Sequence, residues 1–173
     1  MKKLLIAGIM AICFAACEYE IPELPDETQS GANTFGCLVN GELVIPYYNR
    51  RNNNHKQYAV YYQIADSLQI TGYGQNDQFF IITIKSPKIN QPVSIDKIEY
   101  YPPNSSRNYF YGGYNIGEVI LTRFDAMAVS GVFNFVGYQH SHSSNPEENL
   151  IDMNRFVTVS MGRFDIALNV NNK

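Results

Sequence analysis

The 173-residue sequence contains no tryptophan, only three cysteines and few charged residues, which make up 17% of the chain. This charged fraction is below the roughly 25% of ordinary soluble domains, and the net charge is only -3. Both values argue against a coiled coil and against a nucleic-acid binder that works by neutralising phosphates. The sequence also lacks a Gly-rich phosphate loop and the HExxH, Cys-x-x-Cys and Gly-x-Ser-x-Gly motifs, so it carries no known enzyme signature.

Long apolar runs are missing except at the amino terminus. Lys2 and Lys3 precede an 11-residue apolar run that ends at Phe14, and two alanines follow it. This is the pattern of a secretory signal peptide, and the run is much shorter than the roughly 20 residues of a membrane-spanning helix. Phe14-Ala-Ala-Cys17 resembles the lipobox of bacterial lipoproteins. We therefore expect residues 1–16 to be removed and Cys17 to be lipidated, the alternative being an ordinary signal peptide with an incidental cysteine.

The cysteines leave no internal disulfide. Cys13 is lost with the signal peptide and Cys17 is lipidated, so Cys37 has no partner. Cys37 lies in the strand-like run Thr34–Val39. We expect it to be a small buried apolar side chain and not a catalytic thiol.

Charge divides the mature chain into two parts. Residues 18–33 hold five acidic side chains, two prolines and no basic side chain, which predicts a flexible acidic tether over 17–33. The remaining domain, residues 34–173, contains 11 acidic and 11 basic side chains. Acidic residues directly after the lipidated cysteine resemble the surface-export signal of Bacteroidota lipoproteins, and the alternative is a solvated spacer. The expected location is therefore the bacterial outer membrane, facing either the periplasm or the outside.

Alternating apolar residues predict strands throughout the domain, and no segment repeats apolar residues at helical spacing. Asn40-Gly41 supplies the positive φ values of a two-residue hairpin turn. Phe79–Ile84 is apolar on both faces, as in a strand buried on both sides. Other strand-like runs cover residues 57–64, 68–70, 118–124, 128–136, 155–160 and 163–170. We expect one antiparallel β-sandwich of about nine to ten strands, or alternatively a flattened antiparallel, lipocalin-like β-barrel.

The tripeptide Arg-Phe-Asp occurs twice, at Arg123–Asp125 and at Arg163–Asp165. If the two strands are adjacent and antiparallel, Arg123 pairs with Asp165 and Arg163 pairs with Asp125, which would fix the register. The functional alternative is a hydrolase that uses Asp125 and Asp165 as catalytic carboxylates.

Several segments together resemble a family. The start Asn33-Thr-Phe-Gly-Cys37, followed by Val39-Asn-Gly41, the central Ser130-Gly131-Val-Phe133-Asn-Phe135 and the final Gly162-Arg-Phe-Asp165 are similar to small Bacteroidota envelope lipoproteins of unknown function. The resemblance covers residues 33–168. Leu43 and Val44 stand where relatives often have a tryptophan. The resemblance implies a lipid-anchored β-rich domain and no particular activity.

His140 and His142 are a weak candidate metal site. Their spacing places both imidazoles on one face of a strand, and Glu147, Glu148 and Asp152 follow nearby. The surrounding turn-forming residues favour solvated histidines instead. We expect no cofactor.

Tyrosine-rich segments are the stronger functional lead, because tyrosine combines a large contact surface with a polar hydroxyl group. We expect these segments to be loops that contact a glycan or a partner protein. The alternative is that the tyrosines pack on strands and cap the ends of the fold. The candidate ligand-binding residues are Tyr47, Tyr48, Arg50, Tyr100, Tyr101, Tyr109, Tyr111 and Tyr114.

Two functions follow from these features. The first is a non-catalytic binding or accessory module, anchored to the membrane through Cys17 and facing a glycan or a partner protein. The second is an envelope hydrolase that uses Asp125 and Asp165 or a metal at His140 and His142. We expect the chain not to be an enzyme and not to bind nucleic acid.

Overall fold

The computed structural model describes residues 23–46, 57–75, 78–103, 108–112, 116–141 and 151–171, and for 108–112, 140, 141 and 151 it describes the backbone alone. These ranges contain ten β-strands and no helix, so the expected all-β class and its strand number are confirmed. The strands are β1 (Thr34–Val39), β2 (Glu42–Val44), β3 (Tyr58–Tyr62), β4 (Ser67–Tyr73), β5 (Phe79–Lys85), β6 (Pro92–Tyr101), β7 (Asn108–Gly112), β8 (Gly117–Phe124), β9 (Ala128–Ser141) and β10 (Ile151–Asn171).

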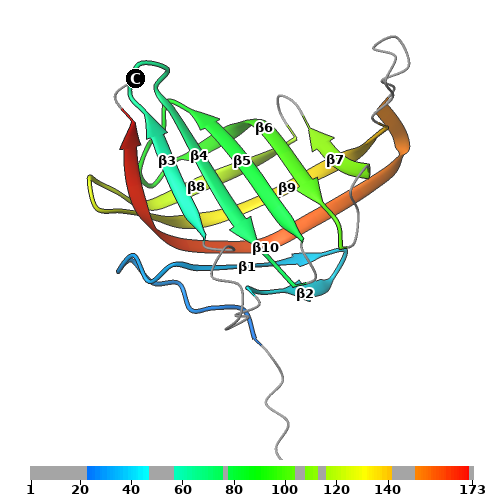
Figure 1. The fold of residues 1–173 in the computed structure, drawn as a ribbon, viewed down its shortest axis with the longest axis horizontal. Helices are drawn as coiled ribbons and strands as arrows, with labels where there is room; N and C mark the ends of the chain where they lie inside the picture. The colour runs from blue at the N-terminus through cyan, green and yellow to red at the C-terminus, as the bar shows by residue number, and fades with distance from the viewer. Residues whose placement is uncertain are drawn as a thin grey trace, which may run out of the picture.

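All ten strands belong to one sheet, in the order β2-β1-β10-β3-β4-β5-β6-β7-β9-β8. Additional pairings of β10 with β9 and of β6 with β8 close the hydrogen bonds into a ring. Every strand pair in the described ranges is antiparallel except β3 with β10. Figure 1 shows β3 to β6 side by side in front of β8, β9 and β10. The fold therefore has the two facing layers of a sandwich, but both layers come from one closed sheet.

The length of β10 makes this closure possible. One edge of β10 pairs with β9 over most of its 21 residues, and the other edge is shared by β1, at 159–165, and β3, at 168–171. The sequence predicts two separate strands here. The structure has one strand because Met161, with a φ of 51°, forms a bulge where the register with β9 shifts between Val159 and Gly162.

The hairpin at Asn40-Gly41 is confirmed. Both residues have positive φ, 51° and 85°, and Val39 pairs with Glu42 across the turn. Asn40 also joins the turn to β10, because its backbone N–H donates to the Thr158 carbonyl at 2.8 Å and its side-chain oxygen accepts from the Thr158 N–H at 2.9 Å.

The core lies between the two layers. Phe35 of β1 packs against Phe80 of β5 and Phe133 of β9, with ring centroids 5.3 and 5.4 Å apart. Cys37 is fully buried, as expected, and burial raises its pKa to about 12. A neutral, buried thiol of this kind is a packing group, not a nucleophile.

Candidate ligand-binding site

The described tyrosines of the predicted loops lie in strands. Residues 92–101 form β6 and residues 108–112 form β7, so the tyrosines at these positions lie within the sheet. Aromatic side chains fit a pleated surface well, which favours strands at these tyrosines. The alternation along β6 sends neighbouring tyrosines to opposite faces, with Tyr100 in the core and Tyr101 on the outside.

Three aromatic side chains that are only partly buried form an outer aromatic row across β4, β5 and β6. Tyr73 pairs in register with Phe79, and Phe79 with Tyr101. The rings of Phe79 and Tyr101 stack with centroids 4.0 Å apart, and those of Tyr73 and Phe79 are 5.9 Å apart. The Tyr101 hydroxyl donates to Glu99 at 2.9 Å. Partial burial, and to a smaller extent the interaction with Tyr58, raises the pKa of Tyr73.

The sequence misses the outer aromatic row for a specific reason. It predicts that the segment at Phe79 is buried on both sides, but in β5 only Phe80, Ile82 and Ile84 reach the core. Phe79 and Ile81 face outward and are half-buried by their cross-strand neighbours. An apolar residue on each face of a strand was therefore the sequence signal that could have indicated apolar side chains on the outer face of the sheet.

A hollow of about 420 Å³, here called the rim hollow, opens at the same end of β4, β5 and β6. Its polar lining groups are amide, carboxylate and hydroxyl groups, and its remaining walls are apolar. Tyr100 is only 3% exposed, and its hydroxyl accepts from Gln78 at 3.4 Å. Burial chiefly raises the pKa of Tyr100 to about 12, so the hydroxyl stays neutral. The lining residues are Val39, Asn40, Glu42, Leu43, Val44, Gln75, Gln78, Tyr100, Pro102, Pro103 and Val157.

The rim hollow and the outer aromatic row share their supporting strands. Tyr100 stacks on Phe80 at 4.6 Å inside the sheet, directly beside the stacked pair of Tyr101 and Phe79 outside it. The turn between Tyr73 and Phe79 carries Gln75 and Gln78, which line the rim hollow. One end of the sheet therefore presents polar groups on its inner side and aromatic rings on its outer side.

Several predicted site residues lie outside the described residues, namely Cys17, Tyr47, Tyr48, Arg50, Tyr114 and His142. Tyr109, Tyr111 and His140 are described by backbone only. Tyr109 pairs with His140, and Tyr111 pairs with Glu99 of β6 and Tyr138 of β9. Their backbones thus continue the sheet next to Tyr101.

The two Arg-Phe-Asp tripeptides do not pair with each other. Their strands, β8 and β10, flank β9 on opposite sides, and Ser130 is the register partner of both Arg123 and Asp165. The expected cross-strand ion pairs are therefore wrong. Arg123 instead binds Asp125 of its own tripeptide at 2.7 Å, and Arg163 binds Glu27 at 3.5 Å.

Asp165 holds the N-terminal strap, which we define as residues 23–33. The backbone N–H groups of Ser30, Gly31 and Ala32 donate to its carboxylate at 2.8–3.1 Å. The hydroxyl groups of Thr28, Ser30 and Ser130 also donate to it, at 2.7, 3.1 and 2.6 Å. Five residues therefore supply the donors, four from the strap and Ser130 from β9. The part of the predicted tether at residues 28–32 is therefore attached to the sheet through Asp165.

The electrostatics of the two aspartates do not match those of a catalytic pair. Asp165 is 1% exposed, and this burial acts to raise its pKa. The hydrogen bonds from Ser130, from Thr28 and from the backbone N–H groups of Ala32 and Gly31 outweigh burial and hold the pKa well below its usual range. The hydrogen bond from Arg123, followed by those from the backbone N–H groups of Met127 and Ala128, lowers the pKa of Asp125 to about 2. A general acid needs a raised pKa, so neither carboxylate is prepared for that role.

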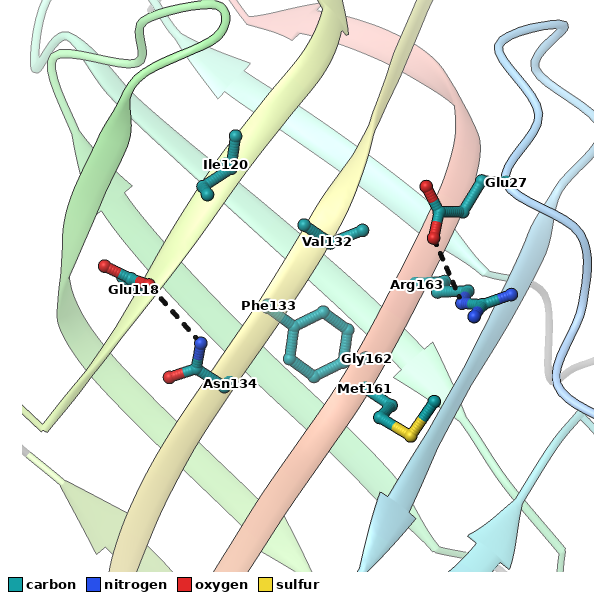
Figure 2. Close-up of a pocket in the computed structure, with 9 residues that line it drawn as sticks. All are labelled: Glu27, Glu118, Ile120, Val132, Phe133, Asn134, Met161, Gly162 and Arg163. Atoms are coloured by element: carbon teal, nitrogen blue, oxygen red, sulfur yellow. Dashed lines mark hydrogen bonds and ion pairs between the residues drawn. The ribbon is translucent and has the colours of Figure 1, made fainter.

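A second hollow of about 260 Å³, here called the side hollow, lies on the outer surface across β8, β9 and β10 (Figure 2). Glu27 of the N-terminal strap contributes to its wall. Among the described residues, no group of three or more His, Cys, Asp or Glu side chains is arranged to hold a metal ion. The described ranges likewise contain no helix that is long and apolar enough to cross a membrane.

Comparisons of the chain with protein-family models, with curated proteins and with solved structures found no match.

Proposed function

We propose that this protein is a non-catalytic binding module that is anchored by lipid at Cys17 in the bacterial outer membrane and binds a glycan at its rim hollow. The signal peptide, the lipobox-like segment and the acidic residues after Cys17 support the location. The resemblance to small Bacteroidota lipoproteins agrees with it.

The observation that carries the proposal is the shared position of the rim hollow and the outer aromatic row. Binding pockets for small ligands measure about 300–1,000 Å³ and combine apolar walls with a few polar groups, which describes the rim hollow. Sugar rings carry hydroxyl groups around an apolar C–H face. Asn40, Glu42 and Gln78 offer hydrogen bonds to such hydroxyls, while Pro102 and the tyrosines offer apolar contact.

The lowered pKa values of Asp125 and Asp165 favour binding over hydrolysis, because both carboxylates are occupied by internal hydrogen bonds. Val44 and Pro103, which line the rim hollow, are followed in the sequence by the Tyr-rich segments.

The experiment is a glycan array on the full-length protein, followed by calorimetry with the best glycan. We expect Gln78→Ala and Tyr101→Ala each to weaken binding by about tenfold, because loss of one good contact changes the free energy of binding by about 1.4 kcal/mol. The double change Tyr109→Ala/Tyr111→Ala tests the neighbouring strand β7 in the same way. Tyr62→Ala, at the opposite end of β3, is the matched control and should bind normally.

Two results would contradict the proposal. Binding that survives all three variants would remove the rim hollow and the outer aromatic row as the site. Capture of a protein partner without any glycan binding would replace the glycan by a protein ligand.

A further inference from the structure

The side hollow is formed by the bulge of β10. At the bulge, Met161 turns outward and is more than half exposed, and Gly162 follows without a side chain. A Cβ at residue 162 would lie 2.5 Å from the buried Phe133 ring, so this ring occupies the space that a side chain at 162 would need. The bulge therefore leaves a depression bordered by Met161 above the half-buried side chains of Ile120 and Val132.

Charges lie at opposite sides of this depression (Figure 2). Glu27 and Arg163 form one side, and their ion pair at 3.5 Å is supplemented by a hydrogen bond from Arg163 to the Pro25 carbonyl at 3.2 Å. Glu118 forms the other side with Asn134. The positive charge of Arg163 is thus balanced by Glu27, and Glu118 leaves the side hollow with a net charge of -1.

Glu118 keeps most of its capacity to accept hydrogen bonds. The Asn134 amide donates to it at 3.5 Å, the outer limit of a hydrogen bond. A carboxylate has about four lone-pair positions, and a bond of this length uses one of them weakly. Glu118 therefore presents a negatively charged hydrogen-bond acceptor beside the apolar side chains of Ile120 and Val132.

We infer that the side hollow is a socket for one basic side chain, lysine or arginine, of a partner protein. The apolar stem of such a side chain covers Ile120 and Val132, and its cationic head reaches Glu118. The volume of about 260 Å³ is below that of pockets that enclose whole small ligands, and it suits a single side chain. This site is separate from the proposed glycan site, and the two can succeed or fail independently.

The test uses the full-length protein and short blocked peptides, Gly-Lys-Gly and Gly-Arg-Gly, titrated by NMR with observation of the Glu118 and Val132 amides. The uncharged matched peptides carry norleucine in place of lysine and citrulline in place of arginine. We expect the basic peptides to bind at least about threefold more tightly than the uncharged ones, and to bind more weakly at high salt.

The variant Glu118→Gln keeps the shape of the side chain and removes its charge. We expect it to reduce the affinity for the basic peptides to that of the uncharged ones, with unchanged thermal unfolding. Asp152→Asn, an exposed carboxylate of β10 outside the side hollow, is the control and should bind normally.

Three results would overturn the inference. They are equal binding of charged and uncharged peptides, unchanged binding by Glu118→Gln, and binding of n-butylammonium as tight as that of the lysine peptide. The last result would assign the socket to free amines and not to a protein partner.

Discussion

At the scale of single residues, Asp165 is the most consequential side chain of the fold. It is a buried carboxylate whose charge is stabilised by hydrogen bonds from the strap and from β9. Because the donors come from residues more than 30 positions away in sequence, the aspartate joins three parts of the chain. Its role is to fix the N-terminal strap, and with it Glu27 of the side hollow.

Replacement of Asp165 by asparagine tests this role. The amide turns N–H donors toward the donors of the strap, so we expect Asp165→Asn to lower the free energy of unfolding by about 2–4 kcal/mol. Asp125→Asn, in the other Arg-Phe-Asp tripeptide, removes an exposed charge and should cost less than about 1 kcal/mol. Urea denaturation measures both changes, and equal effects of the two variants would contradict the assignment.

The same carboxylate predicts a pH dependence. Its pKa is lowered in the folded chain, so its contribution to stability is complete above about 3.9, the pKa of an unperturbed aspartate, and decreases as the pH falls below that value. Urea titrations of the wild type and of Asp165→Asn should therefore differ most at neutral pH and converge in strong acid. A constant difference between them down to acidic pH would show that the charge is not responsible.

Gly72 is a second position where one residue decides local packing. A Cβ there would lie 2.3 Å from Phe35 at the centre of the core. We expect Gly72→Ala to destabilise the protein by about 1–3 kcal/mol, because the Phe35 ring must move. In the double variant Gly72→Ala/Phe35→Leu, thermal unfolding should show a smaller loss than the sum of the two single changes. Strict additivity would mean that the two residues do not meet.

At the scale of elements, β9 and β10 determine which residues meet. β9 separates the two Arg-Phe-Asp strands, and each end of β10 pairs with a different strand. The bulge at Met161 keeps β10 continuous and also forms the side hollow. Short strands alone would produce neither feature, because both depend on a strand long enough to cross the whole sheet.

At the scale of the whole molecule, the parallel pairing of β3 with residues 168–171 of β10 closes the ring. A chain that ends at residue 167 loses this pairing and the packing of Leu168 on the core. We expect it to be less stable by about 2 kcal/mol or more in thermal unfolding. A chain that ends at Asn171 is the control and should unfold like the full chain; equal stability of both truncated chains would contradict ring closure by β3.

The sequence alone is sufficient for the all-β class, for the Asn40-Gly41 turn and for the burial of Cys37. Each of these depends on local properties, namely alternation, positive φ at two residues and an apolar environment within one strand. The sequence also singled out Tyr100 and Tyr101, although it predicted loops where β6 and β7 lie.

Only the tertiary structure decided which strands are neighbours, and therefore where charges and rings meet. The run at Phe79 is apolar on both faces, which predicts burial on both sides, so the sequence left the outer aromatic row undetected. The partners of Asp165 come from the strap and from β9, and no local pattern specifies contacts between residues so far apart. Residue types and their alternation thus determined the strands, while long-range pairing and ring closure determined both hollows.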